Sequence, residues 1–112
     1  MATPLSSGSL TSATTTTPVQ IFGRANLSLT GTFVGTVALE RADSSTGTFT
    51  VVSRDVAGTP ATFTTAFQGW PFEEDEQGMW YRLNCTSYTS GTINWRFGVG
   101  SVLVPGQQAP RP

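Results

Sequence analysis

Apolar and polar residues alternate one by one between Gly78 and Gly91, and this period of two is the feature that most constrains the fold. Tyr81, Leu83 and Cys85 fall on one face of such a strand, and the polar residues between them fall on the other. The run closes on a glycine turn, after which residues Thr92 to Val99 predict a second strand that returns antiparallel beside the first. The sequence therefore predicts a half-buried β-hairpin at the edge of a sandwich.

The same period continues through the centre of the chain, in short runs separated by turns that contain Gly, Pro or Asp. The predicted strands are Val19 to Phe22, Ala25 to Thr30, Thr36 to Ala42, Thr48 to Arg54, Ala61 to Phe67, Trp80 to Tyr88 and Thr92 to Val99. The predicted turns are Gly31 to Gly35, Asp43 to Gly47, Asp55 to Pro60, Gly69 to Gly78 and Thr89 to Gly91. The expected core residues are Leu27, Leu29, Val37, Leu39, Phe49, Val51, Phe63, Tyr81, Leu83, Cys85, Ile93 and Trp95. Because no run has a helical period, glycine-rich nucleotide-binding loops between a strand and a helix are excluded.

The run from Glu76 to Cys85 resembles the turn and inward-facing Tyr that open the sixth strand of immunoglobulin-like domains. The Tyr-to-Cys interval differs from the immunoglobulin pattern, and no partner Cys is present near Leu27, so only the architecture is carried over. We therefore expect an all-β fold, an immunoglobulin-like antiparallel β-sandwich with extended N- and C-terminal arms.

The chain of 112 residues supports a single domain, which we place at residues 19–100. Residues 1–18 are small and hydroxylated, with Leu5 and Leu10 as isolated apolar points. We expect an arm that is either disordered or laid along a neighbouring chain, with both leucines as partner contacts. Residues 101–112 predict a Pro-rich C-terminal tail.

Composition narrows the possible functions. The chain has no His and no Lys, so a Ser or Cys nucleophile would lack its base, and we expect a protein that is not an enzyme and needs no cofactor. The six arginines are scattered and the net charge is −1, which argues against binding to nucleic acid. No signal peptide or membrane span is predicted, so synthesis in a cytoplasm is expected. The single Cys is expected to act as a small core residue.

Four of the seven acids form one cluster, at Glu73, Glu74, Asp75 and Glu76, which the strand pattern places on a loop. One interpretation is a solvated acidic loop, and a second is a contact that seeks an arginine of another subunit. A metal site is the weakest interpretation, because consecutive side chains in a loop rarely converge on one ion.

Aromatic residues flank this cluster. Trp70, Phe72 and Trp80 either form a binding platform for a sugar or a protein, or fill the end of the sandwich. Phe33, between two glycines, predicts a second exposed aromatic contact or a hydrophobic cap.

Two segments, 29–41 and 80–96, resemble small virion proteins of tailed bacteriophages. The first reads Gly-Thr-Phe-x-Gly-Thr-Val-x-Leu-Glu-Arg, and the second contains Tyr-Arg-Leu-x-Cys-Thr-x-Tyr-Thr-Ser-Gly-Thr. The resemblance implies a virion component on the capsid surface, made in the host cytoplasm: a capsid decoration or cement protein. Its partners would be the major capsid protein and neighbouring copies of itself in a homo-oligomer, with a trimer favoured. The resemblance assigns no role to any individual residue.

Two alternatives to a cement protein stay open. The first is a glycan- or host-binding module on the virion surface, based on the aromatic residues and acids described above. The second is a low-copy neck or tail connector protein, which would share the extended arms.

Overall fold

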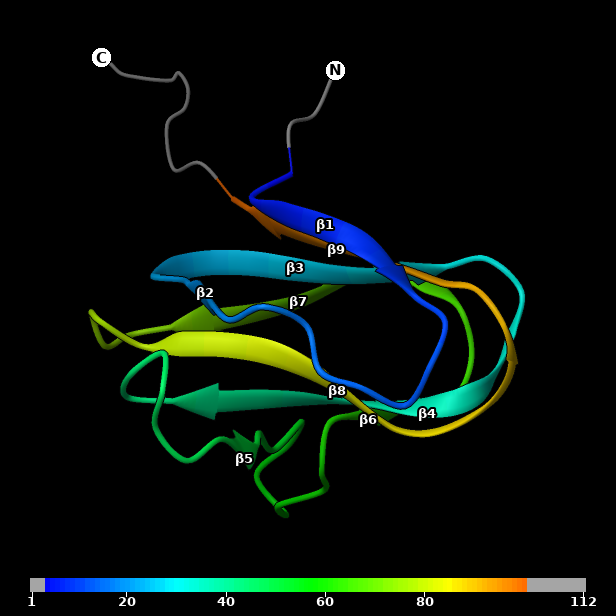
Figure 1. The fold of residues 1–112 in the computed structure, drawn as a ribbon. Coiled ribbons are helices and arrows are strands. Elements are labelled where there is room, and N and C mark those ends of the chain that lie inside the picture. The colour runs from blue at the N-terminus through cyan, green and yellow to red at the C-terminus, as the bar shows by residue number, and fades with distance from the viewer. Residues whose placement is uncertain (1–3, 101–112) are drawn as a thin grey trace.

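The structure is a computed structural model that describes residues 4–100, and these residues contain strands and no α-helix (Figure 1). The strands are β1 (Ser6–Leu10), β2 (Val19–Gln20), β3 (Gly23–Thr30), β4 (Phe33–Ala42), β5 (Thr50–Val51), β6 (Thr62–Phe63), β7 (Phe67–Glu74), β8 (Trp80–Gly91) and β9 (Ile93–Val99). All of their pairings are antiparallel, so the all-β prediction is confirmed. The predicted tail at 101–112 lies outside the described residues.

The strands form two sheets, which are the two layers visible in Figure 1. The first sheet has the order β1-β9-β3-β7, and the second has the order β2-β8-β4-β5, with β6 also paired to β4. The pairs are nested along the chain, because β1 pairs with β9, β2 with β8, β3 with β7 and β4 with β5. This nesting of antiparallel pairs across two sheets is the strand order of a jelly roll.

The predicted hairpin between the last two strands is wrong, because β8 and β9 lie in different sheets. The chain turns from one sheet to the other at Gly91, whose φ is +93°, and β3 passes to β4 at Gly31, whose φ is +96°. The two corners lie side by side, and the N–H of Thr92 donates to the carbonyl of Thr32 at 3.0 Å. In an immunoglobulin-like domain the last two strands are neighbours in one sheet, so the immunoglobulin-like prediction is not confirmed.

One core lies between the sheets and follows the alternation seen in the sequence. Tyr81, Leu83 and Cys85 are buried on one face of β8, as predicted. Phe49 and Val51 were predicted in the core but are only half-buried, because each lies in or next to a strand of two residues at the margin of the second sheet. Ring-to-ring contacts connect seven aromatic residues through this core: Phe63, Phe67, Trp70, Phe72, Tyr81, Trp95 and Phe97.

The N-terminal segment belongs to the sheets of its own chain. Strand β1 pairs with β9 over its full length, and Leu10 is buried in the core. Gly8 lies against the ring of Trp95, from which an added Cβ would be only 3.0 Å away. The structure therefore differs from the expected arm, which was to be disordered or laid along a neighbour. Strand β9 of the same chain supplies the backbone hydrogen-bond partners of β1.

The segment after β1 crosses to the second sheet and runs along β8. The N–H of Cys85 donates to the carbonyl of Thr14, and the N–H of Thr16 donates to the carbonyl of Leu83, both at 2.9 Å. The hydroxyl of Thr16 accepts the N–H of Leu83 at 2.9 Å, and this threonine is buried. Residues 6–20 thus join the edges of both sheets.

The predicted turn from Gly69 to Gly78 is wrong over most of its length, since β7 runs through it to Glu74. Gly69 and Pro71 indicated a turn, but β7 is an edge strand, where a proline without an N–H is tolerated because that side of the strand has no partner. The strands predicted from Thr48 to Arg54 and from Ala61 to Phe67 are reduced to β5 and β6, of two residues each.

Candidate functional site

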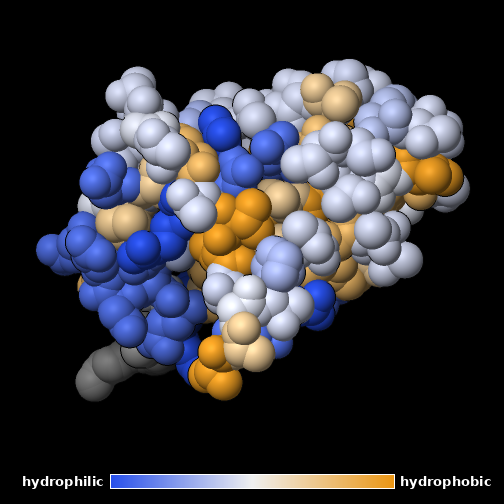
Figure 2. Space-filling model, turned by 90° about the horizontal axis from the view of Figure 1, so that it is seen from below, coloured by the Kyte–Doolittle hydropathy of each residue, from blue (hydrophilic) through white to orange (hydrophobic). Residues whose placement is uncertain are grey.

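A groove lies between the C-terminal half of β7 and residues 48–53, which contain β5, and its volume is about 960 Å³. Its apolar lining consists of Val51, Val52, Trp70 and Phe72, together with Ala42. We call it the β7 groove. Figure 2 shows the molecule from below. An apolar area lies near the middle of the visible surface, and strongly hydrophilic side chains gather at one end.

A cluster of hydrogen bonds closes the inner end of the groove. The guanidinium of Arg41 donates to both carboxylate oxygens of Glu74, at 2.5 Å from Nε and 2.7 Å from Nη2. The same carboxylate accepts the hydroxyl of Tyr81 at 2.7 Å and the N–H of Glu76 at 2.9 Å. Glu74 is 4% exposed and belongs to the first sheet, whereas Arg41 and Tyr81 belong to the second. The Glu74 cluster (Arg41, Glu74 and Tyr81) therefore ties the two sheets together.

The protonation states of the Glu74 cluster follow from these contacts. The hydrogen bond from Arg41, opposed by burial, lowers the pKa of Glu74 to about 2. Burial and the hydrogen bond to Glu74 raise the pKa of Tyr81 well above its ordinary value. Glu74 therefore stays a carboxylate and Tyr81 a phenol near neutral pH, and neither is set to transfer a proton there. The cluster has the properties of a structural ion pair.

The other acids of the groove are available for contact. Asp43, Glu73 and Asp75 are exposed and make no ion pair with a described residue. Glu76 is also exposed, and its carboxylate lies 3.5 Å from Nη2 of Arg41. The predicted acidic loop is thus only partly correct, because Glu73 and Glu74 belong to β7 and Glu74 is buried.

The two aromatic residues of the groove are half-buried and pack against the core. The ring of Trp70 stacks on Phe72 at 5.7 Å between centroids and meets Phe63 edge-on at 5.4 Å. Phe72 in turn contacts Tyr81 at 5.1 Å. Of the two interpretations, filling of the sandwich fits these contacts better than a free platform, and the accessible part of each ring lines the groove.

The remaining predicted contact residues are not brought to this groove. Phe33 is half-buried at the start of β4, and its neighbour Val34 is the exposed residue, at 57%. Leu10 is in the core, whereas Leu5 is 42% exposed beside β9. Phe33, Leu5 and Leu10 thus do not form one surface with Trp70 and the acids.

Sequence reasoning missed Arg41, Val51 and Val52 as groove residues. Arg41 had no local signal, since it meets Glu74 across 33 positions of the chain. Val51 was expected in the core, and its position in a short edge strand leaves it half-buried and in the groove lining.

Within residues 4–100, no three His, Cys, Asp or Glu side chains gather in a way that suits a metal ion. The same residues contain no helix that is long and apolar enough to cross a membrane. Comparisons with protein-family models, curated proteins and solved structures find no match for this chain.

Proposed function

We propose that this chain is a non-enzymatic structural protein of a tailed-bacteriophage virion, a capsid decoration protein that binds the assembled head and stabilises it. The observation that carries the proposal is the β7 groove, an apolar surface with exposed acids that suits a protein partner. Its most perturbed ionisable groups are held in the Glu74 cluster, which favours binding over catalysis. The virion setting comes from the sequence resemblance of segments 29–41 and 80–96.

The fold agrees with this setting by analogy, since jelly rolls recur in viral capsid domains, although a fold does not fix a function. The proposed mechanism is mass action: a protein that binds only the mature shell lowers the free energy of that shell and makes its opening harder. Its partners on the head would be the major capsid protein and neighbouring copies in a homo-oligomer, with a trimer favoured.

The experiment is the copy number of the chain in purified virions, measured by quantitative mass spectrometry against the major capsid protein. A number comparable to that of the capsid protein is expected. A few copies per particle would favour the neck or tail connector instead, and absence from virions would refute the virion proposal. Particles that lack the chain should also lose resistance to heat.

A glycan- or host-binding module is the second candidate, because lectin domains also use jelly rolls and because Trp70 and Phe72 line the groove. This function predicts that the purified chain binds to a glycan array or to host cells. It also predicts that virions without the chain adsorb poorly but keep their heat resistance, which is the opposite of the result expected for a cement protein.

A further inference from the structure

The charges of this chain are divided unevenly between the β7 groove and the rest of the molecule. Among the described residues, the groove contains five of the seven acids (Asp43, Glu73, Glu74, Asp75 and Glu76) and one of the five arginines (Arg41). Its side chains therefore carry a formal charge of −4, whereas the other described residues carry +2. A partner that enters the groove meets an apolar lining and a negative rim.

Arg41 pairs with two acids of the groove, Glu74 at its inner end and the exposed Glu76. Glu74 is held by Arg41, while Asp43, Glu73 and Asp75 have no ion pair among the described residues. We propose that the β7 groove is a docking site for a segment of a partner protein that presents an arginine beside an apolar side chain. This inference rests on the proposed function, because the partner segment would belong to the capsid surface.

The structure itself shows how this chain binds a guanidinium. Arg41 forms a two-pronged pair with Glu74. On the second sheet, Arg82 donates to the buried Glu40 at 2.8 Å, and its Cζ lies 4.3 Å from the ring centroid of Phe49. Planar guanidinium groups bind carboxylates through two parallel hydrogen bonds and stack on aromatic rings, which an ammonium group does not do equally well. The outer groove offers the same combination, with carboxylates at its rim and aromatic rings in its lining.

Strand addition along β7 is a poor way to occupy this site. Pro71 lies in the middle of β7 and has no N–H to donate, and the pairing of β7 with β3 shifts register between Leu27 and Leu29. Both features are known to protect edge strands from pairing with other chains. The partner is therefore expected to contact the groove through its side chains.

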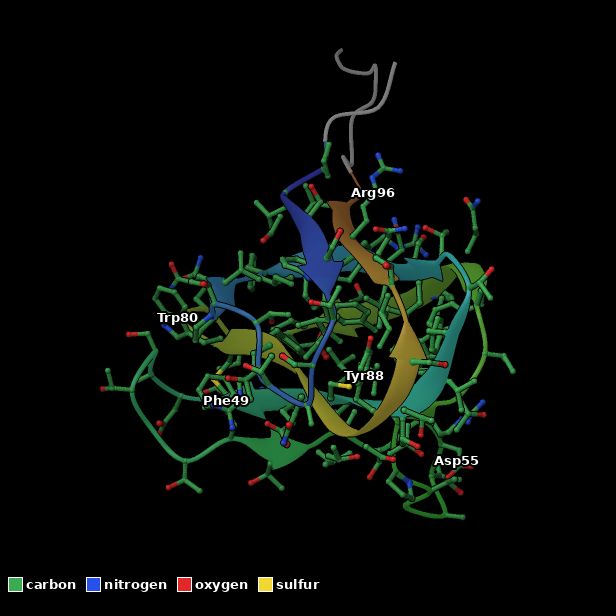
Figure 3. All side chains as sticks on the ribbon, turned by 45° about the vertical axis from the view of Figure 1, so that its right-hand side comes forward. Phe49, Asp55, Trp80, Tyr88 and Arg96 are labelled. Atoms are coloured by element: carbon green, nitrogen blue, oxygen red, sulfur yellow. The ribbon has the colours of Figure 1, made fainter. Side chains whose placement is uncertain are left out.

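A second copy of this chain is a less suitable occupant. Arg24 and Arg96 lie on β3 and β9, the inner strands of the first sheet, so a second copy could present them only from the broad outer face of that sheet (Figure 3 labels Arg96). Arg82 is paired with Glu40, and Arg54 lies over the ring of Phe63 at 5.9 Å from its centroid. Arg54 is the one described arginine that lies outside the strands, and this exposed residue is already placed over an aromatic ring of its own chain.

The test is a titration of the full-length, ¹⁵N-labelled chain with the blocked peptide acetyl-Leu-Arg-Leu-Arg-amide, followed by NMR at low salt. We expect shifts at the amides of Val51, Val52 and Phe72 and at the indole N–H of Trp70. The same peptide with citrulline in place of arginine keeps the shape but loses the charge, and should bind about tenfold more weakly. Shifts confined to other surfaces, or equal binding of the citrulline peptide, would overturn the proposal.

Groove variants make the test specific. The triple variant E73Q/D75N/E76Q leaves the Glu74 cluster in place and should weaken binding of the arginine peptide about tenfold. Asp55→Asn is the matched control: it removes an acid outside the groove and keeps the Oδ1 acceptor for the N–H groups of Ala57 and Thr59. Unchanged affinity in the triple variant would refute the assignment of the site.

Two further measurements separate this inference from its alternatives. Sedimentation of the chain alone detects self-association, and a salt-sensitive dimer that the triple variant abolishes would assign the groove to a second copy. Incorporation into virions tests the proposed function separately. If the wild-type chain is on virions and the triple variant is retained equally, the docking proposal fails while the virion role stands. If the wild-type chain is absent from virions, the proposed function fails even where the peptide binds.

Discussion

Glu74→Gln should destabilise the protein strongly at neutral pH and hardly at all in acid. The ordinary pKa of 4.5 falls to about 2 in the folded protein, and each pKa unit corresponds to about 1.4 kcal/mol. The shift therefore represents roughly 3 kcal/mol. Because Arg41 is 35% exposed, water screens part of this interaction, and we expect about 2 to 3 kcal/mol at pH 7.

The pH dependence has a definite sign. A carboxylate with a lowered pKa stabilises the folded state above its unfolded pKa, and this contribution is lost as the pH falls towards the folded pKa. The difference between wild type and Glu74→Gln should therefore decrease from pH 5 downwards and be mostly gone near pH 2. Urea unfolding at a series of pH values measures it, with Glu73→Gln as the control because the neighbouring Glu73 is exposed. If Glu74→Gln is as stable as wild type at pH 7, or if its deficit is the same at pH 7 and pH 2.5, the structural role of the Glu74 cluster is refuted.

Three other predictions test the fold. Gly91→Ala should lower the free energy of unfolding in urea by more than about 3 kcal/mol, because the new Cβ would lie 2.1 Å from the carbonyl oxygen of the facing corner. Gly23→Ala is the control and should cost about 1 kcal/mol, because Gly23 also has a positive φ but has open space around it. Equal costs would contradict the corner geometry. In thermal unfolding, Leu10→Ala should lower stability by about 2 kcal/mol and Leu5→Ala by less than about 0.5 kcal/mol, since only Leu10 is buried. If Leu10→Ala leaves the stability unchanged, β1 is not part of the core. Cys85 is 2% exposed, and burial raises the pKa of its thiol, so it should react with a thiol reagent only after denaturant is added. Rapid reaction of the native protein would place Cys85 outside the core.

Local patterns in the sequence were enough for the class of fold and most of its core. The alternation in β3, β4 and β8 predicted their inward faces, from Leu27 and Leu29 to Leu83 and Cys85, because successive side chains of a strand point to opposite faces. The same reasoning failed at β7, because an edge strand tolerates residues that an interior strand does not. Pro71 indicates a break in an interior strand but is acceptable in β7, and no local signal distinguishes the two cases.

The candidate site was predictable in part. The acids and aromatic residues of β7 were identified from their clustering alone, yet their roles were not. Glu74 is buried and Glu73 is exposed, although they are adjacent and chemically alike, because alternate positions of β7 face the core and the solvent. The buried Glu74 is paired with Arg41, which lies 33 positions away along the chain and which no spacing rule connects to it.

The sequence by itself determined that this chain is an all-β domain with a continuous apolar core, since those properties follow from a period of two and from residue type. Only the tertiary structure decided which strands are neighbours. Strand β8 continues into β9 after a single residue, yet the two lie in different sheets, because Gly31 and Gly91 form adjacent corners that direct the chain from one layer to the other. Pairing between strands far apart in sequence then brings β7 beside residues 48–53 and creates the groove. Such contacts depend on the free energy of the whole packed core, which local sequence patterns do not contain.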